Sequence, residues 1–510
     1  MSDKIVFWGV CLVIALLPLP FGAVDEWAIF TFEAATFVLF VLSMVGAGRA
    51  DESEKRGGEA GRHLFPLWLK VLSALSLGIA FLQLVPLPPS ILSLISPRAA
   101  AIWGGVSPGA ELGTAARGWA TLSLVPNFTL YELVRYVFYF LFAYLVYKHV
   151  STRKRVKIFV FVLFAGACFQ SFYGLAEFFG GTRRIFGFQR DAYLDSATGT
   201  FINRNHFAGF LEMIFPISVG YLLARASFFT MKRGGSFKER ILWFSQERLQ
   251  KAVVFGIIPI LIGVGIFFSR SRTGIFLFFA SIFLMAVALS GVSGRRAERS
   301  AIKSGRSNFI PNSPLPRWER VQGEGETHSR RRPAPTYGQA LRTVLLVVGF
   351  AVILIGIRPI IERFSFAALA HEVRPVYFKN TAAIIKDFPI VGTGLGTYFY
   401  AYPMYEKKYS GDLLEHAHND YLELLSEAGI VGGGLLIVVA FGALVWVFGR
   451  WAKRNDHLVR GVGLGCLAGI ASILIHSLTD FNLHITANAV LFVTLYALAL
   501  RVVGLEARRN

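Results

Sequence analysis

The chain has 510 residues, of which 54% are apolar and only 16% are charged, and its mean hydropathy is +0.53. A soluble globular domain carries about a quarter charged residues, so this composition excludes a soluble enzyme and indicates a polytopic membrane protein. The formal net charge of +20 would suggest a nucleic-acid partner in a soluble chain. In a membrane protein, basic residues first orient the chain.

Apolar runs long enough to cross the hydrocarbon core of a bilayer, about 17 to 25 residues each, predict twelve membrane helices in an all-α fold. The runs begin near Ile5, Trp27, Leu64, Thr129, Ile158, Phe207, Ala252, Gly274, Leu341, Gly429, Gly461 and Ile485. We interpret the first run, residues 5–23, as a retained span rather than a signal peptide. No internal repeat or soluble domain is apparent, so we expect a single integral membrane domain over residues 1–510.

The basic residues favour one orientation of these spans. With a cytoplasmic N-terminus, the segments predicted inside carry 34 Lys and Arg residues and those predicted outside carry 15. The positive-inside rule therefore predicts that both termini are cytoplasmic. Since most of the positive charge has this explanation, no nucleic-acid partner is expected.

Three connecting segments are unusually long. Residues 291–340, on the cytoplasmic side, are rich in Pro, Gly and Arg without periodicity and are predicted to be a disordered basic insert. A tolerated insertion is favoured over a regulatory role for it. Residues 179–206 and 358–418 are predicted periplasmic loops, the second directly before the tenth span, and long external loops usually carry function.

The cysteines give no sign of a metal or a disulfide. Cys11, Cys168 and Cys466 each lie inside an apolar run, far apart and without a Cys/His ligand spacing. The sequence therefore predicts neither a disulfide nor a zinc site, and no metal or cofactor is expected.

A histidine-rich motif ends the larger external loop. His418-Asn419 is followed after nine residues by Gly429-x-x-Gly432. On a helix, His418 and Gly429 would share one face, with the imidazole about two to three turns above the glycines where the helix enters the membrane. A catalytic imidazole at the lipid–water boundary is one interpretation. The other is that His418 and Asn419 merely cap the tenth helix.

Two arginines occupy a short external turn. Residues 269–274, Ser-Arg-Ser-Arg-Thr-Gly, place Arg270 and Arg272 between two strongly apolar runs, although an arginine at the bilayer centre costs about 2.5 to 3.5 kcal/mol. A bidentate guanidinium suits a diphosphate group. The alternative is that both side chains reach to lipid headgroups.

Two further external clusters carry polar side chains. Asn203, Arg204, Asn205 and His206 stand at a helix entrance, where they could orient a sugar or a phosphate. The alternative is that Asn203 is a simple helix cap and His206 an interfacial residue. In the last external turn, structural hydrogen bonding is favoured over a proton relay. Its polar residues are His476, Asp480, Asn482, His484 and Asn488.

Together these blocks resemble the O-antigen ligase and O-antigen polymerase superfamily of bacterial envelope membrane proteins. The blocks are the His418-Asn419 motif with its two glycines, GTFINRNHFAG at 199–209, SRSRTG at 269–274 and GTGLGTY at 392–398. Residues 476–488 are similar to a block of exopolysaccharide polymerases in this group. The resemblance covers roughly residues 120–500, with the insert at 295–338 as its main departure.

The resemblance implies a GT-C-like, metal-independent glycosyltransferase in the bacterial inner membrane, with its active site on the periplasmic face. Its donor would be an undecaprenyl-diphosphate-linked glycan. Its acceptor would be a hydroxyl of a glycan, of lipid A core or of a protein. Membrane lipids surround such an enzyme, and other polysaccharide-assembly proteins are candidate partners.

The resemblance also implies roles for individual residues. His418 would be the base or would orient the acceptor, and Arg272 and Arg374 would stabilise the diphosphate leaving group. Substrate-binding roles fall to Arg270, Asn419, Asn203, Arg204, Asn205 and His206. A polymerase is slightly favoured over a ligase by residues 476–488.

A transporter or flippase is the rival class. It is suggested by charged residues within or at the edges of apolar runs, and disfavoured because the two halves of the chain show no matching discontinuous spans. These residues are Glu33, Glu132, Arg135, Glu177 and Glu212.

Overall fold

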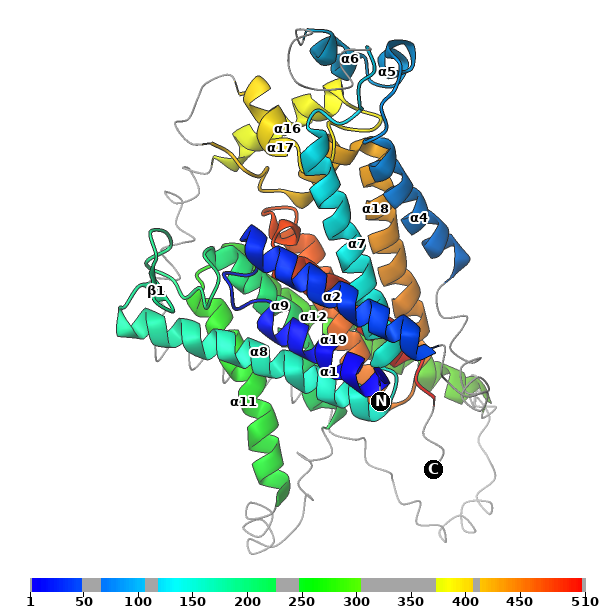
Figure 1. Cartoon of the computed structure of the whole chain (residues 1–510). Coiled ribbons are helices and arrows are strands. Elements are labelled where there is room, and N and C mark those ends of the chain that lie inside the picture. The colour runs from blue at the N-terminus through cyan, green and yellow to red at the C-terminus, as the bar shows by residue number, and fades with distance from the viewer. Residues whose placement is uncertain are drawn as a thin grey trace, which may run out of the picture.

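The structure is a computed structural model in which residues 2–47, 66–105, 118–225, 247–303, 373–406 and 413–506 are described (Figure 1). Within these residues it consists of helices and one small antiparallel sheet. The longer helices are α1 (Ser2–Leu16), α2 (Glu26–Ala47), α4 (Leu67–Leu82), α7 (Pro126–His149), α8 (Arg153–Gly180), α9 (Arg204–Ala224), α11 (Glu247–Phe268), α12 (Arg272–Lys303), α16 (Arg374–Asp387), α18 (Asp420–Ala452), α19 (His457–His476) and α20 (Thr486–Val503). The short elements are α5 (Pro89–Ile95), α6 (Pro97–Gly104), α17 (Tyr398–Ala401), η5 (Tyr402–Met404), η6 (Asn482–His484) and the strands β1 (Arg184–Ile185) and β2 (Phe188–Gln189).

Eight of the described helices are long and apolar enough to cross a membrane, and the predicted all-α polytopic class is confirmed. They are α2, α7, α8, α9, α12, α18, α19 and α20. The spans predicted near Ile5, Leu64 and Ala252 correspond to α1, α4 and α11, whose described apolar stretches are shorter. The span predicted near Leu341 lies outside the described residues, so the number twelve stays a prediction.

Two of the long loops contain structure. Part of the segment predicted to be disordered, residues 291–303, continues α12 as a helix, and residues 304–340 lie outside the described part of the chain. The helix extends because residues 295–303 are mostly good helix formers, without glycine or proline. In the larger external loop, residues 378–388 lie in or directly after α16, and residues 358–372 are not among those described.

Helices α9 and α19 form the centre of the bundle, and most of each is buried by other helices. Their close approach depends on glycines at Gly461, Gly465 and Gly469, four residues apart on α19. A Cβ atom on Gly465 would lie 2.4 Å from the Cα atom of Ile217 on α9. Small residues at this spacing let two helix backbones pack directly against each other in a membrane.

The connecting segments gather at two opposite ends of the bundle. At one end, the Asp3 carboxylate contacts His149 Nδ1 at 2.6 Å and the Arg155 guanidinium at 2.5 Å. The starts of α1 and α8 therefore meet the end of α7. At the other end, helices α5, α6, α16 and α17 form a cap, as Figure 1 shows at the top. The cap has its own hydrophobic core, which includes Leu122, Ile384, Phe388, Tyr398 and Tyr402.

The start of α18 is tied to the cap. Gly429 interrupts the helix with φ 66° and ψ −179°, a conformation that glycine alone adopts without strain. At this break Ile430 N donates to Pro389 O at 2.8 Å, and Gly394 N donates to Glu427 O at 2.9 Å. The glycine-rich turn at 392–398 thus holds the first two turns of α18 against the cap.

Candidate active site beneath the cap

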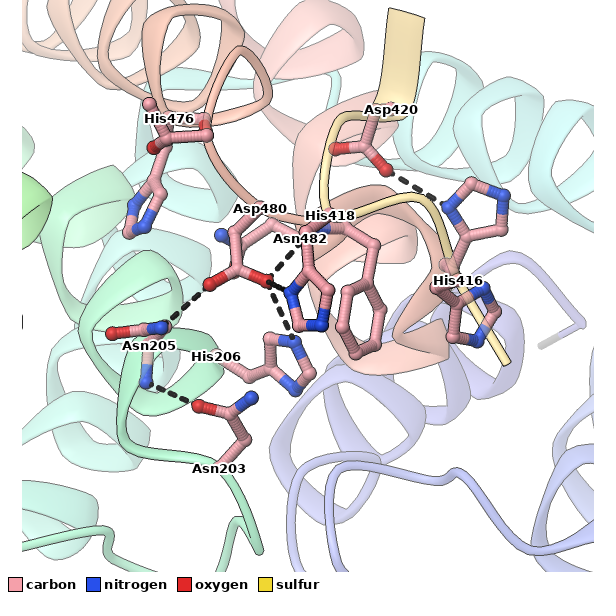
Figure 2. A network of polar contacts seen from close by, with 12 residues as sticks. Asn203, Asn205, His206, His416, His418, Asp420, His476, Asp480 and Asn482 are labelled. Carbon is pink, nitrogen blue, oxygen red and sulfur yellow. Dashed lines mark hydrogen bonds and ion pairs between the residues drawn. The ribbon is translucent and has the colours of Figure 1, made fainter. Parts of the chain in front are cut away.

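Asp480 is the centre of a polar cluster at the cap end of the bundle (Figure 2). It lies in the turn after α19, and its side chain is 1% exposed. Its Oδ2 accepts a hydrogen bond from Asn205 Nδ2 at 2.5 Å and one from the Arg374 guanidinium at 3.2 Å. Its Oδ1 accepts from Phe481 N at 3.0 Å. Segments that are far apart in the sequence, at the starts of α9 and α16 and the end of α19, therefore meet at one carboxylate.

His418 contacts the same carboxylate. Its Nδ1 lies 3.2 Å from Asp480 Oδ1, and its ring lies between the Tyr377 ring, centroid distance 6.1 Å, and the edge of Phe481, at 4.9 Å. The side chain remains 24% exposed. Its backbone φ is 52°, which is uncommon for a residue with a side chain and typical of functional sites.

The predicted helical position of His418 is wrong. Helix α18 begins at Asp420, because the Asn419 side chain caps it by accepting hydrogen bonds from Tyr421 N and Leu422 N, both at 3.0 Å. His418 therefore precedes the helix and shares no helical face with Gly429. The alternative that Asn419 is a helix cap is confirmed. Asn419 Nδ2 also donates to Leu478 O at 2.9 Å, so the cap fastens the start of α18 to the turn that carries Asp480.

The start of α9 supplies the other side of the cluster. Asn203 is the helix cap, as one interpretation predicted, and its Oδ1 accepts from Asn205 N at 2.8 Å. His206 is buried rather than at the lipid interface, with its Nε2 atom 3.9 Å from Asp480 Oδ1. Asn205 and His206 thus both face Asp480, whereas Asn203 orients the helix that carries them.

A second acidic residue, Asp195, contacts two of the predicted site arginines. Asp195 Oδ2 accepts from the Arg270 guanidinium at 2.8 Å, and its Oδ1 lies 3.6 Å from the Arg204 guanidinium. Arg204 also lies over the Tyr193 ring, 4.9 Å from its centroid. Because Arg204 and Asn205 are consecutive, this arginine cluster and the Asp480 cluster share the first turn of α9.

Arg272 begins α12 and is partly exposed. Its neighbour Thr273 places a hydroxyl 3.1 Å from that of Thr479, the residue before Asp480. The Ser-Arg-Ser-Arg turn therefore packs beside the turn that carries Asp480. The structure brings all nine predicted site residues to the cap end of the bundle.

The electrostatics keep Asp480 ionised. Burial would raise the pKa of Asp480, but the hydrogen bond from His418 and the positive charge of Arg374 hold that pKa well below its usual range. At Asp195, burial likewise opposes ionisation, while the Ser196 hydroxyl and the two arginines lower the pKa. Both carboxylates are therefore negatively charged at neutral pH.

A third cluster lies next to His418. His416 Nδ1 is 2.7 Å from Glu423 Oε1, and His484 Nε2 is 3.2 Å from the same oxygen. His484 Nδ1 also contacts Asp420 Oδ1 at 2.9 Å. Burial would lower the pKa of His484, but Glu423 and Asp420 raise it to about 10. At neutral pH the proton on His484 therefore offsets one of the two carboxylate charges.

The sequence does not single out the three acidic residues around which these clusters form, Asp480, Asp195 and Glu423. The sequence favours structural hydrogen bonding for the turn that contains Asp480. The contacts of Asp480 with His418 and Arg374 arise only in the tertiary structure. The available signal was that Asp480 is an acidic residue in a turn rich in histidine and asparagine. Asp195 and Glu423 had no comparable signal in the sequence.

The family model described as O-Antigen ligase matches residues 255–437. The matched part contains the arginine turn at 269–274, Arg374, the glycine-rich turn at 392–398 and the His418-Asn419 motif. The blocks at 199–209 and 476–488 lie outside it. A search of curated proteins finds no match to the chain.

Proposed function

We propose that the chain is a glycan-transferring membrane enzyme of the O-antigen ligase type, because its residues 255–437 match the family model of O-antigen ligases. In this proposal it moves a glycan from undecaprenyl diphosphate to an acceptor hydroxyl at the Asp480 cluster. We assign the cap end of the bundle to the periplasmic face of the inner membrane, because the basic residues Arg153, Lys154 and Arg155 at the start of α8 lie at the opposite end. The observation that carries the proposal is the contact between His418 Nδ1 and the buried carboxylate of Asp480 at 3.2 Å.

This contact supports His418 as the general base. An ionised carboxylate only accepts hydrogen bonds, so the shared proton resides on Nδ1 and the lone pair on Nε2. In the proposed step, the acceptor hydroxyl oxygen attacks the anomeric carbon of the donor sugar and its proton moves to Nε2 of His418. Asp480 stabilises the imidazolium that results, as the aspartate does in carboxylate–histidine pairs of other enzymes.

The arginines match the leaving group. As the new glycosidic bond forms, the bond between the anomeric carbon and the diphosphate oxygen breaks, and negative charge develops on the diphosphate. Arg374 lies in the Asp480 cluster and Arg272 begins the helix beside it, which supports their role in neutralising that charge. Arg270 and Arg204, held by Asp195, would bind the diphosphate further from the reacting carbon. No step is assigned to a metal.

The remaining predicted residues have positioning or binding roles in this proposal. Asn205 and His206 present an amide and an imidazole to the same site and would orient the donor sugar. Asn203 and Asn419 act through the helices that they cap. Their substitution should therefore affect the geometry of the cluster rather than remove a reacting group.

The test uses a strain lacking this protein, complemented with wild type, His418→Ala or His457→Ala. His457 is an exposed histidine at the start of α19, at the end of the bundle away from Asp480, and serves as the matched control. Loss of a general base lowers turnover about 10²- to 10⁴-fold, so His418→Ala should abolish detectable transfer. His457→Ala should behave as wild type. Envelope polysaccharide and lipid-linked glycans are read on parallel gels.

The same gels identify the acceptor. If the strain without the protein contains only single-repeat lipid-linked units, the protein is a polymerase. If that strain accumulates long chains that stay on the lipid carrier, the protein is a ligase. Normal glycan in both fractions from His418→Ala membranes would contradict the base assignment. Lipid-linked glycan translocated in proteoliposomes without new glycosidic bonds would support the transporter class instead.

A further inference from the structure

The cluster of His416, Glu423 and His484 has no part in the proposed transfer, and its side chains are of metal-ligating types. The structure assigns a Zn²⁺ site to these three residues, and this inference goes beyond the proposed function. It also differs from the expectation of no metal that the sequence gives, because the three residues become neighbours only when the chain folds.

The potential ligand atoms of the three residues lie close together. His416 Nδ1 and His484 Nε2 lie 2.7 and 3.2 Å from Glu423 Oε1, and the potential ligand atoms all lie within 4.8 Å of one another. Ligand atoms around a tetrahedral zinc ion, with bonds of about 2.0 to 2.1 Å, are about 3.3 Å apart. Small rotations of the two imidazoles would therefore admit an ion between them.

A second layer of contacts orients two of the ligands. His484 Nδ1 lies 2.9 Å from Asp420 Oδ1, which directs the opposite nitrogen, Nε2, toward Glu423. Ala417 N donates to Glu423 Oε2 at 2.7 Å, so Oε1 is the oxygen that faces both histidines. A carboxylate on the far nitrogen of a ligating histidine is the usual support of a zinc ligand.

The donor set and the charge favour zinc. The side chains of Glu423 and Asp420 are only 2% and 6% exposed, and two buried carboxylates need positive charge nearby. A zinc ion would supply that charge in place of the proton on Nε2 of His484, which would be released when the metal binds. Two imidazoles with one carboxylate suit Zn²⁺, whereas Ca²⁺ and Mg²⁺ prefer oxygen ligands. Three protein ligands leave a fourth coordination position for water.

The ion would join three separate segments. His416 belongs to the segment 413–418, Glu423 to α18 and His484 to η6 between α19 and α20. His416 precedes His418 by two residues, and Phe481 contacts the rings of both, with centroid distances of 4.3 and 4.9 Å. Zinc at this site would fix the segment that carries His418 without contacting the substrate.

The test is zinc binding by the full-length protein in lipid nanodiscs, purified with an affinity tag that contains no histidine. After loading with ZnCl₂ and removal of excess ion, wild type and His457→Ala should each retain about one zinc per chain. His416→Ala should retain none. Asp420→Asn should bind zinc about 10- to 100-fold more weakly, as expected for loss of a supporting carboxylate.

A second measurement does not depend on the variants. Co²⁺ added to wild type should give the visible absorption of a tetrahedral site, and Zn²⁺ should remove it by competition. If wild type retains no more zinc than His416→Ala, the three side chains are joined by hydrogen bonds alone and the proposal is overturned. Absence of the Co²⁺ absorption would overturn it equally. Neither result would affect the transfer assigned to His418, which the glycan gels test.

Discussion

Asp480 connects residues that lie up to 275 positions apart in the sequence. Its carboxylate contacts Asn205, Arg374 and His418, and His206 lies near it. A buried carboxylate is stable only when hydrogen bonds and opposite charges replace its hydration. The residues that compensate the charge of Asp480 are therefore also held in place by it.

The Asp480→Asn variant should lose stability in a pH-dependent way. Because the pKa of Asp480 is lower in the folded chain than its ordinary value of 3.8, ionisation stabilises the fold above that pH. This contribution is lost progressively as the pH falls from about 4 toward the lower pKa of the folded chain. Removing one partner of a buried ion pair costs on the order of 3 kcal/mol, so the variant should unfold at a lower temperature than wild type at pH 7.

The difference in unfolding temperature between wild type and Asp480→Asn should narrow at pH 2.5, where wild type has lost part of this contribution. Thermal unfolding in nanodiscs at both pH values measures it. Asp191→Asn, which changes an exposed aspartate in the external segment before α9, is the control and should match wild type at both. If wild type exceeds the unfolding temperature of Asp480→Asn by the same amount at pH 7 and at pH 2.5, ionisation of Asp480 does not stabilise the fold.

Helices α9 and α19 set the distance between the two halves of the site. The first turn of α9 carries Asn205 and His206, and the turn after α19 carries Asp480. Near the site, His476 Nδ1 also contacts Glu212 Oε1 at 3.0 Å, with both side chains 1% exposed. One of the charged residues that suggested a transporter thus has a partner within the bundle.

The Gly465→Ala variant should separate these helices. The added Cβ atom would lie 2.6 Å from Pro216 O and 2.4 Å from the Ile217 Cα atom, and backbone atoms cannot move aside cheaply. Overpacking of this kind costs about 1 to 3 kcal/mol. We expect a lower unfolding temperature together with reduced transfer.

Gly166→Ala is the matched control, since Gly166 lies on α8 and a Cβ atom there would have no neighbour within 4 Å. It should preserve or raise the unfolding temperature, because alanine favours a helix by about 0.8 to 1.0 kcal/mol over glycine. Equal behaviour of the two variants would show that close packing of α9 on α19 is not required.

In the described part of the bundle, the basic start of α8 and the Asp480 cluster lie at opposite ends. Arg153 pairs with Asp456 at 2.9 Å at the end that also holds Asp3, His149 and Arg155. The cap lies at the other end (Figure 1), and Arg374 at the start of α16 joins it to Asp480. The proposed orientation of the site toward the periplasm follows from the positive-inside rule.

Cysteine labelling tests this orientation. In a background without Cys11, Cys168 and Cys466, a membrane-impermeant thiol reagent should label Ser90→Cys, exposed in α5 of the cap, in cells with an intact inner membrane. Lys154→Cys, exposed at the start of α8, should be labelled only after that membrane is permeabilised. The reverse pattern would place the site in the cytoplasm. Normal glycan output from both variants confirms that they are folded.

The sequence by itself determined the class of fold and the residues of interest. Apolar runs located the described membrane helices, because the length of a span is imposed by the bilayer and not by its neighbours. The sequence offers Asn203 as a helix cap, and the structure confirms it. Such a cap can be predicted because it is a local interaction. The block at 418–432 indicated the family through residues that are close together in the chain.

Only the tertiary structure decided how those residues are used. It placed His418 before α18 rather than on it, and it brought Asp480 to that imidazole from 62 positions away. It also joined His416, Glu423 and His484 into one cluster. Sequence patterns could not show these contacts, because the pairing of buried charges depends on how helices from distant parts of the chain pack together.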